Sequence, residues 1–344
     1  MKKNLARILV VCLAIALTAC GSTPAASPAP VESGSAPVAP APSLPKQQLT
    51  LVTGSTGGTY FALGGAMATA WTKNVDHVTV SCLSSGASVE NMNLLQKGEA
   101  DLGMAMNSIA DAAWNANAPF TAKTNNVRAI GVVYPEVIHI VATAETGAND
   151  LADLRGKRVA LGPAGSGGAV FSEIAFAAAG IDATKDINAQ RDSFSDATAK
   201  MQDGHLDASV SVLAVPASAI VELETSKKIN FINISDEVLE AIRKDYPFYT
   251  RFKIPANTYS NTADVDTVTC QAALYCTSSL DEETVYLITK SFYENSADVA
   301  ATHAAGKYIN LDTALDGITT PLHKGAVRYF TEKGINVPAN LIID

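Results

Sequence analysis

Two glycine-rich loops are the stretches of this sequence whose residue types and spacing best suit ligand binding. The first, GSTGGTYFALGG at 54–65, follows an apolar run at 49–53, and the second, GPAGSGG at 162–168, follows another at 159–161. Glycine lets the backbone approach a ligand closely, and a helix that begins there adds free N–H groups and the positive end of its dipole. We therefore predict that both loops bind an anion such as a carboxylate. The candidate ligand-binding residues of the two loops are Gly57, Gly58, Thr59, Tyr60, Gly165, Ser166 and Gly167.

The residue patterns that nucleotide binding, metal binding or catalysis would require are not found in the sequence. Neither loop contains G-x-G-x-x-G or a Lys followed by Ser or Thr, which disfavours a bound nucleotide, and Ala164 stands where a G-x-S-x-G nucleophile elbow needs its first glycine. The five histidines are scattered and form no H-E-x-x-H or Cys/His pattern. We predict no catalytic residue, no metal site and no cofactor. For either loop alone, a plain turn at a helix start is an equally good interpretation.

The elements around the loops recur along the chain. Short apolar runs alternate with longer helical patterns, which is the order of an α/β fold. The matching positions are Gly54 and Gly162 in the loops, Ser88 and Ser193 as expected helix caps, and Gly98 and Gly204 as expected helix ends, at offsets of 108, 105 and 106 residues. We therefore predict two similar lobes, each a central sheet flanked by helices, with the two loops facing each other across one cleft.

Further candidates follow the same strands. Ser88 is expected to cap a helix, and Ser88 or Asn91 to reach the ligand. Glu90 suits either an ammonium group of the ligand or simply the helix dipole. Asn107 and Pro216, 109 residues apart, are expected to begin the next helix of each lobe, with Asn107 close to the cleft.

The first 46 residues indicate export. Residues 1–19 combine three basic residues with the short apolar run ILVVCLAIAL, which is typical of a signal peptide. The segment ends in LTAC, similar to a bacterial lipobox, so we expect Cys20 to be lipidated and to anchor the chain to the cell membrane, facing the periplasm or exterior. Residues 20–46 are rich in Pro, Ala and Ser and are predicted to be a disordered tether.

The charge and the cysteine content of the chain after the signal peptide limit the kinds of partner and of covalent cross-link that we expect. Loss of the signal, with three basic and no acidic residues, would take the formal net charge from −9 to −12, which disfavours nucleic acid. The cysteines left in the folded part, Cys82, Cys270 and Cys276, are odd in number, so we favour free thiols, with a bond from Cys82 to either of the others as the alternative.

Six ordered blocks resemble the TAXI solute receptors of TRAP transporters over residues 49–337. The blocks are TGSTGGTYFALGGAMA, SSGASVENMNLLQKGEADLGMA, ADLRGKRVALGPAGSGG, FSDATAKMQDGHLDASV, YPFYTRFKIPANTY and PLHKGAVRYFTEKGI. The resemblance implies a two-lobed periplasmic-binding-protein fold of type II that captures glutamate, glutamine or a related dicarboxylate. Its partner would be a TRAP membrane subunit, often fused from small and large components and driven by a sodium or proton gradient. The chain departs from the family in having Gly168 where a hydroxyl residue is usual and Asn107 where an acidic residue is expected.

On this basis we predict a monomeric receptor with a first lobe at 47–142 plus 265–344 and a second at 143–264. Cleft closure would be a hinge motion at connections near Ala142 and Asp264. Two alternatives remain open: a ligand-binding lipoprotein that serves a sensor kinase or adhesion, and a secreted enzyme on the same scaffold.

Overall fold

The computed structural model describes residues 44–343. The predicted signal peptide, the lipidated Cys20 and all but the end of the 20–46 tether lie outside these residues. Within the described part, no helix is long and apolar enough to cross a membrane.

Strands and helices alternate along the described chain. The strands are β1 (Gln47–Val52), β2 (Val78–Leu83), β3 (Leu102–Met106), β4 (Val127–Thr143), β5 (Arg158–Ala160), β6 (Asn188–Gln190), β7 (Ala208–Leu213), β8 (Ile229–Phe231), β9 (Thr250–Ile254) and β10 (Val265–Thr277). The α-helices are α1 (Thr59–Asn74), α2 (Ser88–Lys97), α3 (Asn107–Asn115), α4 (Gly167–Ala178), α5 (Phe194–Gln202), α6 (Ser218–Glu224), α7 (Asp236–Arg243), α8 (Glu282–Glu294), α9 (Ser296–Thr302) and α10 (Lys324–Glu332).

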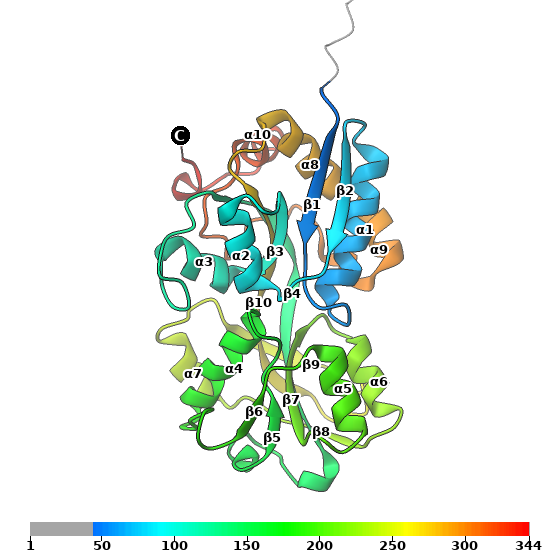
Figure 1. Cartoon of the computed structure of the whole chain (residues 1–344), viewed down its shortest axis with the longest axis vertical. Helices are drawn as coiled ribbons and strands as arrows, with labels where there is room; N and C mark the ends of the chain where they lie inside the picture. The colour runs from blue at the N-terminus through cyan, green and yellow to red at the C-terminus, as the bar shows by residue number, and fades with distance from the viewer. Residues whose placement is uncertain (1–43, 344) are drawn as a thin grey trace, which may run out of the picture. The chain divides into compact units, whose positions relative to one another are not determined.

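All ten strands form one hydrogen-bonded sheet in the order β2-β1-β3-β10-β4-β7-β5-β6, with β8 paired to β4 and β9 paired to β10. The pairs β1–β2 and β1–β3 are parallel, as are β5–β6 and β5–β7, whereas β4 and β10 run antiparallel to each other and to their neighbours. The predicted repeat therefore corresponds to two sets of parallel strands. Two long antiparallel strands join the sets (Figure 1). β4 ends at Thr143 and β10 begins at Val265, close to Ala142 and Asp264, where the sequence predicts the connections between lobes.

The long strands change partners part-way along their length. β4 pairs with β10 up to Val137 and with β7 from Val137 to Ala142. β10 pairs with β9 up to Thr269 and with β3 from Ala272. We call the elements on the β1–β3 side, with α1–α3 and α8–α10, the first half, and those on the β5–β9 side, with α4–α7, the second half. The lobe boundaries predicted at 142 and 264 stay a prediction.

Several local predictions are confirmed. Gly98 ends α2 in the left-handed conformation, with φ of 71°. Ser193 caps α5, its hydroxyl accepting the Asp196 N–H at 3.1 Å. Asn107 begins α3. In the described chain Cys82, Cys270 and Cys276 are free thiols.

Two local predictions are wrong. The N-cap of α2 is Ala87 rather than Ser88, because the Ser88 hydroxyl faces β3 and accepts the Met106 N–H at 3.1 Å. Pro216 is not the first residue of its helix, since α6 begins at Ser218 after an Ala217 N-cap.

Candidate functional site: a closed cavity between the halves

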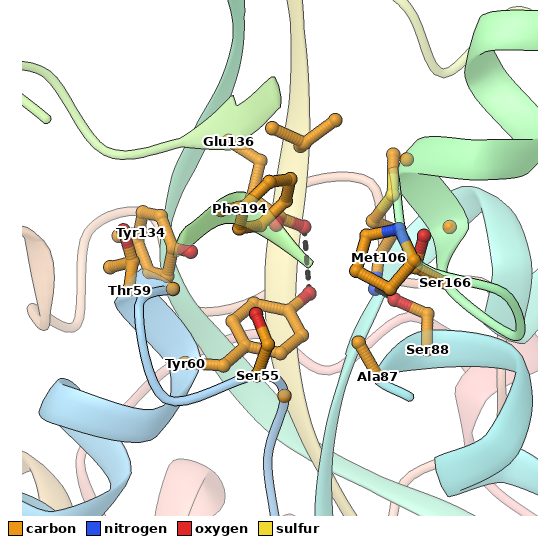
Figure 2. A pocket seen from close by; sticks show the side chains of 16 residues that line it. Ser55, Thr59, Tyr60, Ala87, Ser88, Met106, Tyr134, Glu136, Ser166 and Phe194 are labelled. Atoms are coloured by element: carbon orange, nitrogen blue, oxygen red, sulfur yellow. Dashed lines mark hydrogen bonds between the residues drawn. The ribbon is translucent and has the colours of Figure 1, made fainter. Parts of the chain in front are cut away.

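A small cavity lies where helix starts from both halves meet (Figure 2). Its volume is about 30 Å³, roughly enough for two water molecules. A solute of amino-acid size therefore requires the halves to stand slightly further apart than they do here. Six of the predicted ligand-binding residues line it: Gly58, Thr59, Tyr60, Ser88, Ser166 and Gly167.

Two other predicted residues lie at the contact between the halves. A Cβ on Gly57 would overlap the Ser195 hydroxyl of the second half, so this glycine permits close approach of α5. The Gly165 carbonyl accepts the N–H groups of Val89 and Glu90 at 3.0 and 3.2 Å. Gly165 thus binds the start of α2 itself, and those two N–H groups are occupied.

The remaining predicted residues do not line the cavity. The Asn91 amide donates to the carbonyls of Thr53 and Met104, both at 2.7 Å, and so ties β1 to β3. The Asn107 amide donates to the Gly317 carbonyl at 2.9 Å. These two asparagines therefore position neighbouring segments, whereas Pro216 is exposed.

The principal residue that sequence reasoning missed is Glu136. It lies on β4, is 3% exposed, and accepts a hydrogen bond from the Tyr60 hydroxyl at 2.7 Å. Figure 2 shows this pair across the cavity. One signal was available in the sequence, because Glu136 is the single acidic residue within the apolar run VVYPEVIHIVA. A charged residue in such a run is rarely buried without a partner or a function.

Burial controls the charge of this carboxyl. Desolvation raises the pKa of Glu136 from 4.5 to about 8, while the Tyr60 and Tyr134 hydroxyls act in the opposite direction. Burial also raises the pKa of Tyr60 well above its usual value. Among the described residues, no Lys, Arg or His lines the cavity. Glu136 is therefore largely protonated at neutral pH while the cavity holds no cation.

Two hydroxyl groups of the lining lack hydrogen-bond partners in the described part of the chain. They are the Ser55 Oγ, in the loop before α1, and the Tyr134 Oη, on β4. The Tyr134 hydroxyl lies close enough to Thr59 and Glu136 to interact with both, but it makes no hydrogen bond of good geometry with either. Buried polar atoms are rarely left unpaired in native proteins, and a ligand or water in the cavity can supply the missing hydrogen bonds.

Direct contacts between the halves close the cavity. The Thr59 hydroxyl at the start of α1 accepts the Ala214 N–H, which follows β7, at 3.1 Å. A Cβ on Gly167 would overlap Met106 Sδ and lie 3.0 Å from Ile109 Cγ1. The start of α4 thus fits against β3 and α3 only because this position has no side chain.

A family model for the NMT1-like family matches residues 51–334. The chain belongs to the NMT1-like family. A solved structure from Bordetella bronchiseptica RB50 aligns with a TM-score of 0.52 and 12% identity, covering 84% of this chain and 98% of that one. A binding-protein component of an ABC phosphonate transporter from Pseudomonas aeruginosa aligns with a TM-score of 0.51 and 10% identity, covering 77% and 80% of the two chains.

The solved structures share the fold of this chain, the periplasmic-binding-protein fold of type II. The α/β architecture expected from the sequence is confirmed. The cavity between the first and second halves lies where the sequence predicts the ligand, in a cleft between two lobes, and its use as the ligand site stays a prediction.

Proposed function

We propose that this NMT1-like chain is an exported, lipid-anchored receptor that closes over a small carboxylate solute and delivers it to a TRAP-type membrane subunit. The observation that carries the proposal is the cavity between the halves, whose lining combines the two glycine loops with the starts of α1, α2 and α4. Elements from both halves contribute to this lining. Movement of the halves therefore changes access to the cavity, as a receptor requires.

Helix starts favour an anionic group in this cavity. α1 has 16 residues, and its first turn carries no side-chain cap within the described structure. The Gly58 N–H donates to the Ser55 carbonyl at 2.9 Å, so the free N–H groups are those of the first turn from Thr59 onward. The start of α4 adds the backbone of Gly167 and Gly168. Free N–H groups and the dipole of a long helix stabilise a carboxylate without a basic side chain.

The TRAP partner and the lipid anchor rest on sequence features alone. The six blocks from 49 to 337 support the partner, and the lipobox-like LTAC at 17–20 supports the anchor. The binding protein from P. aeruginosa is named as part of an ABC phosphonate transporter. The energy source therefore separates the partner classes, because a TRAP subunit uses an ion gradient and an ABC transporter uses ATP.

The binding part of the proposal is tested by thermal shift of the full chain, stripped of solute, against amino acids, 2-oxo acids, dicarboxylates, phosphonates and sulfonates. We expect at least one carboxylate to raise the melting temperature in a concentration-dependent way. Native mass spectrometry of the chain as isolated would then identify any retained solute. A response to phosphonates or sulfonates alone would contradict the carboxylate proposal.

The transport part requires a membrane partner. The polytopic protein encoded beside this chain would be reconstituted in liposomes with the loaded receptor outside. Uptake driven by a sodium or proton gradient without ATP is the expected result. Uptake that requires ATP would replace the TRAP partner with an ABC transporter and leave the receptor function intact.

A further inference from the structure

The cavity contains a buried acid and no base. Glu136 is the one carboxyl group in the lining, and the described lining residues include no Lys, Arg or His. A site for a simple carboxylate would be expected to have the opposite arrangement, because two like charges in one small cavity repel strongly. The position of Glu136 therefore carries information about the ligand.

Glu136 is held in place from two sides. It lies where β4 passes between the halves, and its backbone carbonyl accepts the Thr269 hydroxyl of β10 at 2.7 Å. One carboxyl oxygen, Oε2, accepts the Tyr60 hydroxyl at 2.7 Å. Tyr60 in turn packs edge-on against Tyr134, with ring centroids 6.2 Å apart. The carboxyl is thus fixed in the cavity wall, beside the unpartnered hydroxyl of Tyr134.

The other titratable groups that face this carboxyl are neutral at physiological pH. They are Tyr60 from α1, Tyr134 from β4, Cys270 and Tyr275 from β10 and Tyr249 from the segment before β9, and burial raises the pKa of each. None of them can supply a positive charge to balance an ionised Glu136. In the described chain that charge has to come from the ligand, or Glu136 has to carry a proton.

We propose that Glu136 is the specificity-determining residue that binds the ammonium group of a zwitterionic amino acid, while the starts of α1 and α4 bind its carboxylate. This inference rests on the proposed function, because it assigns the second end of the same carboxylate solute. An ammonium group donates up to three hydrogen bonds. Glu136 and the Tyr134 hydroxyl lie in the same wall to accept them.

Charge balance favours the zwitterion over a simple acid. A carboxylate without an ammonium group binds only while Glu136 stays protonated, so its binding takes up a proton wherever Glu136 is ionised beforehand. A zwitterion binds the ionised form and leaves the closed cavity with paired charges. Its binding takes up no proton, and releases one wherever Glu136 is protonated beforehand.

Glu90, which the sequence suggested as an ammonium partner, is not placed for that role. It is exposed, its Oε2 accepts the Gly86 N–H at 2.8 Å, and it is not part of the cavity lining. It therefore provides a matched control, since it is a second acid from the same region whose neutralisation should leave binding unchanged.

The test uses matched pairs of probes that differ only in the ammonium group. L-glutamate is compared with glutarate, and L-alanine with propanoate, by isothermal titration of the full chain in two buffers of different ionisation enthalpy. We expect an amino acid to bind at least about thirtyfold more tightly than its partner acid, without proton uptake. Glu136→Gln should reduce amino-acid affinity by at least about thirtyfold, because a buried ammonium loses its counter-charge.

The controls separate recognition from folding. Glu90→Gln should leave affinity within about twofold. Tyr134→Phe should weaken amino-acid binding, whereas Tyr293→Phe, which removes another buried unpartnered hydroxyl on α8, should not. If Glu136→Gln fails to fold, two measurements still test the inference: the comparison of Tyr134→Phe with Tyr293→Phe, and the number of protons exchanged when the wild-type protein binds each probe.

Two other outcomes overturn the inference in distinguishable ways. If glutarate or propanoate binds as well as its amino acid, and no proton is released at neutral pH, Glu136 is a proton-carrying ligand contact and the carboxylate receptor stands. If no probe and no member of the wider carboxylate panel binds, the proposed carboxylate function fails together with the inference.

Discussion

The two glycine loops differ in what they offer the cavity, although they occupy corresponding places in the repeat. In the first loop, Thr59 and Tyr60 direct hydroxyls to the second half and to Glu136. In the second loop, the Ser166 hydroxyl is occupied by the Ala169 N–H at 3.0 Å, as the N-cap of α4. The side chains that distinguish one ligand from another therefore come mainly from the first half.

The second loop contributes shape and closure. Gly167 fits against Met106 and Ile109, and the Gly165 carbonyl occupies the start of α2. Similar sequence spacing thus gives two arrangements of contacts, and under the proposed function the first loop would recognise the solute and the second would cover it. Substitutions in the first loop should alter selectivity, whereas substitutions in the second should alter affinity for every solute alike.

The largest expected effect concerns the acid that the first loop contacts. Burial raises the pKa of Glu136 from 4.5 in the unfolded chain to about 8, so the folded state binds its proton more tightly. This contribution to stability is complete below pH 4.5, falls as pH rises towards 8, and is flat above it, with a slope of at most about 1.4 kcal/mol per pH unit. The glutamine in Glu136→Gln cannot ionise, so the stability of this variant should not fall in this way as pH rises.

Urea unfolding of wild type and Glu136→Gln at pH 4.5, 6, 7 and 8 would measure the effect. The difference in unfolding free energy should grow with pH, to several kcal/mol. Glu90→Gln should not change the pH dependence. A constant difference between wild type and Glu136→Gln would mean that the carboxyl is solvated in the ligand-free protein, as it would be if the halves stay apart.

The next effect tests closure by the second loop. Gly167→Val places a side chain against Met106 and Ile109, so the start of α4 cannot reach β3 and α3. Overpacking of this kind costs about 1–3 kcal/mol, which should weaken binding of all solutes by about fivefold to a hundredfold. Small-angle scattering with saturating solute should show a larger radius of gyration than wild type.

Gly65→Ala is the matched control for that substitution. A Cβ on Gly65 meets no atom within 4 Å, and the residue lies inside α1. The change should leave affinity unaltered and raise stability by up to about 1 kcal/mol, because Ala favours a helix. Equal losses of affinity in the two variants would refute a specific role of Gly167 in closure.

A smaller effect is expected from the hydroxyl that connects the loops. Thr59→Val keeps the shape of the side chain but leaves the buried Ala214 N–H without its acceptor when the halves close. An unsatisfied buried donor costs about 1–3 kcal/mol, so affinity should fall between about fivefold and a hundredfold. Because each half keeps its own contacts, the loss in unfolding free energy without solute should be smaller than the loss in binding free energy. Calorimetry and thermal melts of the same samples would separate the two.

The sequence predicted the local parts of this arrangement and missed those that depend on distant contacts. The alternation of strands and helices, the place of the two loops, the Ser193 cap and the Gly98 helix end follow from signals within a few residues, and the structure confirms them. Glu136 was missed because its role arises where β4 crosses between the halves and Tyr60 reaches it. Asn91 was read as a ligand contact, since no short-range pattern indicates that its amide joins two strand ends.

The smallest effect concerns the hydroxyl that the second loop uses for its own helix. Ser166→Ala removes the N-cap of α4, which should lower stability by about 1 kcal/mol and the melting temperature by a few degrees. Because the Ala169 N–H already uses this hydroxyl, the affinity for solute should change less than in Thr59→Val. Ser193→Ala is the matched comparison, since it removes the N-cap of α5, a residue that is not part of the cavity lining. A loss of affinity in Ser166→Ala much greater than in Ser193→Ala, at equal loss of stability, would mean that Ser166 contacts the solute and that both loops recognise it.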